Sequence, residues 1–142
     1  IPTVILNAIS NKPIPLYGSG NNIRDWLHVD DHIDALLLSA IIGKVGKKYC
    51  IGGDQEKNNK EIVNMICDYL DNVLKKDHSH KELIKNIEDR PGHDFRYSID
   101  SSLIKRDLGW DSKTNFNKGL ENTINWYLNN QSWCLSKIKS NI

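Results

Sequence analysis

Apolar residues recur along this chain with two periods, one close to that of a helix and one close to that of a strand. Helical spacing is clearest in Ile62, Val63, Ile66 and Leu70, which would share one apolar face. Short apolar runs bounded by Gly, Pro or Asn favour strands instead. The pattern predicts helices at 4–9, from Asp30 or Asp31 to Ile42, from Asn58 or Asn59 to Leu74, from Asp100 to Leu108 and from 114–117 to Leu128, and it predicts strands at 14–17, 23–29, 48–51 and 97–99.

Helices and strands alternate in this pattern, but the strands are few and short. The mixture indicates an α/β chain, or an α+β domain when the chain is taken alone, rather than a complete doubly wound sheet. We expect one domain over residues 1–131 and a weakly patterned tail over 132–142. His78 and His80 fall in a charged segment, and without Cys or carboxylate partners at a recognisable spacing we expect a solvated connector there, not a metal site.

The composition of the chain argues against several classes of function. The chain has 142 residues and a formal net charge of +1, so no overall field favours nucleic acid or an anionic membrane. No apolar run is long enough to span a bilayer, and no signal-peptide pattern is present. The three widely spaced cysteines suggest neither a disulfide framework nor a metal centre, so we expect a cytoplasmic protein. Because the chain begins Ile1-Pro2 and its only methionine is Met65, we expect it to be cut from something longer.

One stretch could bind an anion. A glycine-rich turn at 18–20 precedes a strand-like run with Arg24 in its middle. A guanidinium placed there can bind two oxygens of a phosphate or carboxylate. The alternative is an ordinary strand arginine paired with Asp25 or Asp30, and the local sequence leaves both open.

Further candidates lie elsewhere in the chain. Arg90-Pro91-Gly92-His93 is a turn that a ligand could approach closely, or an ordinary charged loop. Asn59 could donate to a phosphate at the start of its helix, or simply cap it. Tyr17 could stack on a base or sugar, or be an edge-strand aromatic.

Much familiar catalytic chemistry is missing from the sequence. No GxGxxG segment is present to hold a dinucleotide. None of the five tyrosines is followed four positions later by lysine, and there is no nucleophile motif. Asp30 and Asp31 are adjacent and are better explained as helix-capping residues than as a catalytic pair.

Several segments together resemble the extended short-chain dehydrogenase/reductase family. They are Pro15-Leu16-Tyr17-Gly18-Ser19-Gly20, Ile23-Arg24-Asp25-Trp26-Leu27-His28-Val29-Asp30-Asp31-His32, Tyr49-Cys50-Ile51-Gly52-Gly53 with Glu56-Lys57-Asn58-Asn59, Asp89-Arg90-Pro91-Gly92-His93-Asp94-Phe95-Arg96-Tyr97-Ser98-Ile99-Asp100, and Leu108-Gly109-Trp110. Within that family the resemblance is to the dehydratases of dTDP-sugars. It covers nearly all of the chain.

The resemblance implies that this chain is the C-terminal, substrate-binding part of such an enzyme. Arg24 would hold the diphosphate with help from Asn59. The thymine and deoxyribose would lie against Pro15, Leu16 and Tyr17. The nucleotide site would be closed by Arg90, His93 and Tyr97.

It also implies that an N-terminal Rossmann half binds NAD and carries the catalytic residues, so that the chain alone has neither. The full-length enzyme would be a homodimer, whereas this chain would self-associate through apolar surface that the missing half covers. Two alternatives stay open. One is another nucleotide-sugar enzyme of the same fold, such as a UDP-glucuronate decarboxylase or an epimerase, and the other is a non-catalytic nucleotide-binding module.

Overall fold

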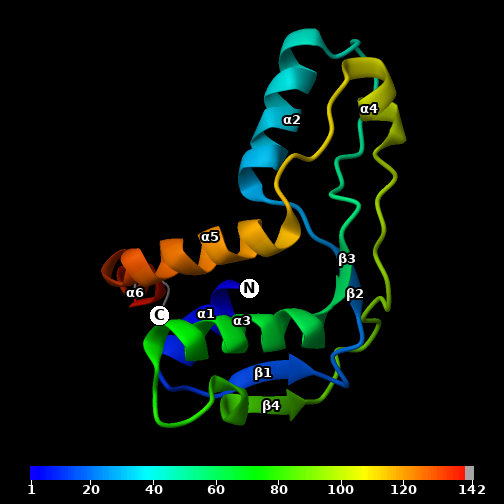
Figure 1. Ribbon diagram of the computed structural model, residues 1–142. Coiled ribbons are helices and arrows are strands. Elements are labelled where there is room, and N and C mark those ends of the chain that lie inside the picture. Colours follow the sequence, from blue (N-terminus) through cyan, green and yellow to red (C-terminus); the bar gives the residue numbers. More distant parts are fainter. Residues whose placement is uncertain (140–142) are drawn as a thin grey trace. The chain divides into compact units, whose positions relative to one another are not determined.

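The structure is a computed structural model that describes residues 1–139. It mixes helices and strands, as the sequence pattern predicts (Figure 1). Two compact units are formed by segments that alternate along the chain. Unit 1 comprises Ile1–Gly20, Lys60–Arg90 and the chain from Leu120 onward, and unit 2 comprises Asn21–Asn59 and Pro91–Gly119.

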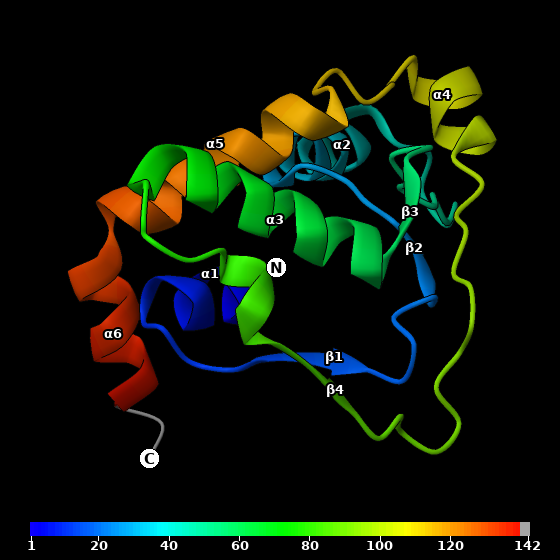
Figure 2. The ribbon, with the colours of Figure 1, turned by 60° about the horizontal axis from the view of Figure 1, so that its bottom comes forward.

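Unit 1 is built around a parallel strand pair. Strand β1 (Ile14–Tyr17) pairs with β4 (Ile84–Ile87) in the register Ile14↔Ile84 to Tyr17↔Ile87. Helix α3 (Asn59–Leu74) lies alongside this pair in both views (Figures 1 and 2). The predicted apolar face of α3 is buried, at Ile62, Val63, Ile66, Cys67 and Leu70. Helices α1 (Pro2–Ile9) and α6 (Gln131–Lys139) and most of α5 (Phe116–Asn129) complete the unit.

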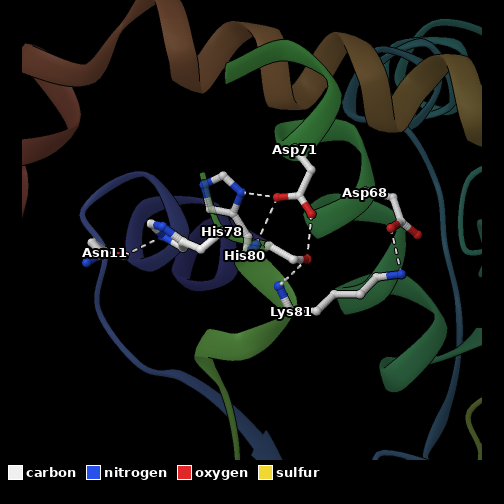
Figure 3. A network of polar contacts seen from close by, with 7 residues as sticks. Asn11, Asp68, Asp71, His78, His80 and Lys81 are labelled. Atoms are coloured by element: carbon white, nitrogen blue, oxygen red, sulfur yellow. Dashed lines mark hydrogen bonds and ion pairs between the residues drawn. The ribbon is translucent and has the colours of Figure 1, made fainter. Parts of the chain in front are cut away.

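A buried histidine joins α3 to the segment that leads into β4. His80 opens the short 3-10 helix η1 (His80–Leu83) and its side chain is fully buried. Its backbone N–H donates to the Asp71 carboxylate at 2.8 Å, its ring Nδ1 contacts the same carboxylate, and the Ser79 hydroxyl donates to it at 2.6 Å (Figure 3). The expectation that His80 is part of a solvated connector is therefore wrong, because Asp71 supplies a partner nine residues away. His78 bonds Asn11 at 3.2 Å instead.

Unit 2 contains a second, antiparallel strand pair. Strand β2 (Ile23–Asp25) pairs with β3 (Glu56–Asn58), and residue 96 forms a parallel bridge to Ile23 on the other side of β2. Helices α2 (Val29–Ile42) and α4 (Ser102–Leu108) belong to this unit. Its core is Ala35, Ile104 and Trp110, with Leu27, Leu38, Tyr49, Ile51 and Leu108 packed against it.

Three predicted strands differ from the structure. The strand expected at Ile23–Val29 ends at Asp25, because its pairing with β3 runs only from Ile23↔Asn58 to Asp25↔Glu56. Residues 48–51 form no strand, since Tyr49 and Ile51 pack on the unit 2 core without a partner strand. Residues 97–99 form no strand, and the bridge to Ile23 comes from the residue before them, 96. Conversely, the pattern predicted no strand at Glu56–Asn58 or at Ile84–Ile87, where the structure has β3 and β4.

The start of α2 also differs from the prediction. The N-cap is His28, whose ring accepts a hydrogen bond from the Asp30 backbone at 3.4 Å, and not Asp30 or Asp31. Asp31 is instead buried and accepts a hydrogen bond from the Thr114 backbone at 2.9 Å. Burial raises the pKa of Asp31, but hydrogen bonds from Thr114 and Lys113 outweigh it, and the pKa is lowered. Asp31 therefore ties α2 to the segment before α5.

The later helices agree better with the pattern. Asp100 accepts a hydrogen bond from the Ser102 backbone at 2.9 Å, and α4 ends at Gly109, whose φ of 69° is left-handed. The tail expected to be weakly patterned forms α6, with Cys134 buried, although residues 140–142 lie outside the described part. Among the described residues, no helix is long and apolar enough to cross a membrane, and no cluster of His, Cys, Asp and Glu could hold a metal ion.

Candidate functional site

Arg24, at the centre of β2, is held by neutral groups. Its Nη1 donates to the Ile23 carbonyl at 2.6 Å, and its Nη2 donates to the Asp94 carbonyl at 3.0 Å. The same Nη2 lies 2.9 Å from Nε2 of His93. The guanidinium also lies 4.5 Å from the centre of the Tyr97 ring, which provides a cation–π contact. No carboxylate is among the hydrogen-bond and ion-pair partners of Arg24 within residues 1–139, so Asp25 and Asp30 do not neutralise it.

Asp25 has a different task. Its two carboxylate oxygens accept hydrogen bonds from the backbone N–H groups of Gly53 and Gln55, each at 2.9 Å. Gly53 is required there, because a Cβ on it would lie 2.3 Å from the Trp26 carbonyl oxygen. The glycine pair at 52–53 therefore lets the loop before β3 approach β2 closely.

The segment after Pro91 supplies the other groups around Arg24. Gly92 has a φ of 68°, which favours glycine, and it precedes His93 and Asp94. The Asn22 side chain donates to the Asp94 carbonyl at 3.4 Å, and the Tyr97 hydroxyl donates to the Asp94 carboxylate. Asp94 therefore positions both the guanidinium, through its carbonyl, and the ring beneath it, through its carboxylate.

A second arginine fixes this segment to β3. Nε and Nη2 of Arg96 donate to the two carboxylate oxygens of Glu56 at 2.7 and 2.6 Å, and the Ser98 hydroxyl donates to the same carboxylate at 2.8 Å. Hydrogen bonds from Arg96 and Ser98 lower the pKa of Glu56. The charge of Arg96 is thus neutralised by a carboxylate of the chain, whereas that of Arg24 is not.

Asn59 lies at the first position of α3, as expected. Its backbone N–H donates to the Asn22 carbonyl at 3.1 Å, and the next N–H, of Lys60, donates to the Gly20 carbonyl at 2.9 Å. Two of the helix-start amides that could have met a phosphate are therefore already bonded. Of the polar groups of Asn59 itself, the side chain is therefore the donor left for a ligand.

Four of the predicted residues lie in unit 1. Leu16 is buried, and a Cβ on Gly20 would lie only 2.8 Å from its side chain. Tyr17 follows it at the end of β1 and is 39% exposed. The Arg90 guanidinium carbon lies 5.4 Å from the centre of the Tyr17 ring. Pro15, half-buried, pairs with Lys85 of β4.

The structure thus brings the predicted residues together in two groups. Arg24, His93 and Tyr97 meet in unit 2, and Tyr17 and Arg90 meet in unit 1. The sequence analysis did not single out Asp94, Glu56 or Arg96 as site residues. Asp94 lies three positions before Tyr97, and this short spacing could have indicated their contact. No local pattern links Glu56 to Arg96, which is forty positions away.

Comparison with known proteins gives these groups a context. A dTDP-glucose 4,6-dehydratase of Salmonella typhimurium is 49% identical over 140 residues, which cover 99% of this chain and 38% of that protein. A crystal structure of the dTDP-glucose 4,6-dehydratase DesIV from Streptomyces venezuelae, with NAD bound, superposes with a TM-score of 0.84 at 37% identity, over 94% of this chain and 39% of that one. The enzyme of the same name from Bacillus anthracis, also in complex with NAD, gives 0.80 at 41% identity, over 92% and 39%.

The chain therefore spans somewhat more than a third of the length of the relatives it matches. The family model described as GDP-mannose 4,6 dehydratase matches residues 1–123, which include both groups of predicted site residues. A match over so much of the sequence shows the relationship: the chain belongs to the GDP-mannose 4,6 dehydratase family.

Proposed function

We propose that this chain is the nucleotide-binding part of a dTDP-glucose 4,6-dehydratase, and that Arg24 binds the diphosphate of the substrate. The observation that carries the proposal is the state of Arg24. Its guanidinium is positioned by backbone carbonyls, His93 and the Tyr97 ring, yet its hydrogen-bond partners within the described residues are all neutral. A partly buried cation without a carboxylate partner suits an anionic ligand, because the protein leaves its charge uncompensated.

The remaining predicted residues have supporting roles in this proposal. Tyr97 and His93 stand beside Arg24, and the Asn59 side chain would assist at the diphosphate. In unit 1, the half-exposed ring of Tyr17, with Arg90 beside it, would take the planar base. The side chain of Leu16 is buried, so its part would be to support Tyr17 rather than to touch the nucleotide.

The whole protein would convert dTDP-glucose to dTDP-4-keto-6-deoxyglucose by internal redox and loss of water, with NAD as the hydride carrier. The residues of this chain do not fit an NAD site. Its glycine turns at 18–20 and 52–53 lead into the strands β2 and β3, whereas a dinucleotide site needs a glycine turn that opens a helix. We propose that NAD is held elsewhere in the full-length protein, as a homodimer, and we derive no step through it.

The proposed role of this chain is therefore to position the substrate. A nucleotide held by Arg24 at its diphosphate leaves the sugar as the part that reaches the reacting groups. Binding energy gained on such a remote handle contributes to catalysis by fixing the orientation of the reacting part.

Titration calorimetry of this chain with dTDP-glucose, UDP-glucose and GDP-mannose tests the proposal. We expect binding of dTDP-glucose, weaker binding of the other two, and no turnover of dTDP-glucose when NAD is added. Preference for UDP-glucose would favour the second candidate, a decarboxylase or epimerase of UDP-sugars, and the absence of binding to all three would contradict a nucleotide-binding role. Turnover by this chain would contradict the proposal that this chain only binds the nucleotide and that NAD is held elsewhere in the full-length protein.

A further inference from the structure

The contact between Arg24 and His93 determines where the histidine carries its hydrogen. Nη2 of Arg24 lies 2.9 Å from Nε2 of His93. A guanidinium has only donors, so Nε2 must be the acceptor in this contact. The imidazole is therefore neutral here, and its single hydrogen is on Nδ1. In this form His93 joins the Asp94 and Ile23 carbonyls in holding the guanidinium.

Protonation of His93 would remove this contact. An imidazolium has a hydrogen on both nitrogens, so Nε2 could no longer accept, and two cations would stand 2.9 Å apart. Asp94, the acid next to His93, already accepts a hydrogen bond from the Tyr97 hydroxyl. Lys57 of β3 is paired with Arg24 across the strands and adds positive charge, although its ammonium lies 5.2 Å from the centre of the Phe116 ring. Arg96 is neutralised by Glu56.

An anion reverses this balance. A diphosphate beside Arg24 would attract a second cation, and a protonated His93 offers one, with an N–H aimed at the place where the guanidinium had been its partner. The cost of placing two cations together falls when an anion with several oxygens lies between them.

We propose that His93 is a proton-dependent latch on Arg24: neutral, it holds the guanidinium, and a nucleoside diphosphate opens it with uptake of one proton from solvent onto Nε2. This rests on the proposed function of Arg24. It makes binding of the nucleotide stronger as the pH falls, because binding takes up a proton.

The first measurement needs no ligand. Nitrogen chemical shifts of the His93 ring, recorded by NMR at pH 8.5 in the free chain, should show the hydrogen on Nδ1. In Arg24→Gln that preference should relax, whereas in the control Arg106→Gln, on α4 of the same unit, it should not change. A hydrogen on Nε2 of His93 in the unsubstituted chain would overturn the latch.

The second measurement is calorimetric titration with dTDP-glucose at pH 7 in two buffers of different ionisation heat. Neither phosphate of this ligand carries a proton that titrates near neutrality, so an uptake belongs to the protein. We expect uptake of a measurable fraction of a proton by the unsubstituted chain and by His32→Gln, an exposed histidine on α2. His93→Gln, which can accept from Arg24 but does not titrate, should take up none.

The outcomes separate the two proposals. Binding with equal heats in both buffers, or uptake that persists in His93→Gln, would overturn proton coupling while leaving the nucleotide site intact. The absence of binding in every variant would contradict the proposed function and, with it, the coupling to a nucleotide. The ring-nitrogen measurement then decides alone whether neutral His93 holds Arg24.

Discussion

The carboxylate of Asp71 accepts two hydrogen bonds from His80, one from its backbone N–H at 2.8 Å and one from its ring Nδ1 (Figure 3). The other ring nitrogen, Nε2, is buried without a hydrogen-bond partner among the described residues. Because Nδ1 donates to the carboxylate, Nε2 is left as a bare acceptor, which is the less costly kind of buried atom to leave unpaired. The pair thus joins α3 to η1 with an ionised Asp71.

We predict that Asp71→Asn destabilises the chain by about 1–3 kcal/mol at pH 7, the scale of a buried hydrogen-bond group left without its partner. Burial raises the pKa of Asp71, but hydrogen bonds from His80 and Ser79 outweigh it and lower the pKa below its ordinary value of 3.8. A carboxyl with a lowered pKa in the folded state stabilises above its unfolded pKa, and this contribution is lost as the pH falls through the folded one.

Urea denaturation at several pH values checks this prediction. The difference in free energy of unfolding between the unsubstituted chain and Asp71→Asn should be constant above about pH 5 and should shrink below pH 4. Asp68→Asn is the matched control, since Asp68 forms a surface ion pair with Lys81 that should contribute under about 1 kcal/mol. Equal losses of unfolding free energy in Asp71→Asn and Asp68→Asn would show that the hydrogen bonds to His80 stabilise the chain no more than a surface ion pair does.

Glu56→Gln should loosen the segment that carries His93 and Tyr97. The substitution removes the charge that Arg96 and Ser98 bind, so the backbone hydrogen bond from Tyr97 N–H to the Ile23 carbonyl, 3.1 Å long, should open more often. Hydrogen exchange of the Tyr97 amide measures this opening. We expect faster exchange in Glu56→Gln and little change in Asp34→Asn, whose partner Lys113 lies 3.8 Å away on the surface.

The same reasoning gives a pH dependence. The pKa of Glu56 is lowered by hydrogen bonds from Arg96 and Ser98, so protection of the Tyr97 amide should fall as the pH drops below the ordinary value of 4.5. Glu56→Gln should lack this dependence. Unaltered protection in Glu56→Gln at neutral pH would mean that the Arg96 pair does not order the segment.

Helix α2 leaves apolar side chains on the surface of unit 2. Exposed fractions reach 77% for Ile41 and 56% for Leu37, and Ile33 and Leu36 are about half exposed. A contiguous apolar face of this kind favours association. We predict that sedimentation velocity shows concentration-dependent self-association, and that Leu37→Ser with Ile41→Ser reduces it without lowering the melting temperature. A clean monomer at high concentration would contradict this.

Elements with a strong local signal were predictable from the sequence. Ile62, Ile66 and Leu70 repeat at helical spacing, and α3 follows them. The partner of a strand could not be predicted from the sequence in the same way. β1 pairs with β4, some seventy residues on, and the four-residue run at Ile14–Tyr17 does not specify that partner. Residues 48–51 show the converse, since their composition favours a strand but no neighbour completes it.

The predictions of the α2 cap and of the exposure of His80 were wrong, because in both cases a residue distant in the sequence determines the contact. Aspartate is a strong N-cap, yet Asp31 is bound by the Thr114 backbone, eighty-three positions away, and His28 takes the cap. His80 is polar and lies in a charged segment, and only Asp71 explains its burial.

The candidate site shows the same limit. The local sequence pointed to Arg24 and His93, and the resemblance to a family added Tyr97, but neither predicted their mutual contact. The groups that position Arg24 are mainly backbone carbonyls, of Ile23 and Asp94, and backbone atoms leave no mark on sequence composition. Their roles had to come from the structure.

The central claim is that Arg24 binds the diphosphate, and the affinity of the chain for dTDP-glucose with and without this side chain tests it most directly. Calorimetry should show Arg24→Ala binding weaker by on the order of 2 kcal/mol, about thirtyfold, as expected for a lost charge-assisted hydrogen-bond pair. Arg106→Ala, on the exposed face of α4, should bind as the unsubstituted chain does, and thermal melts should show that both variants fold. Unchanged affinity in a folded Arg24→Ala would remove Arg24 from the diphosphate site and contradict the account.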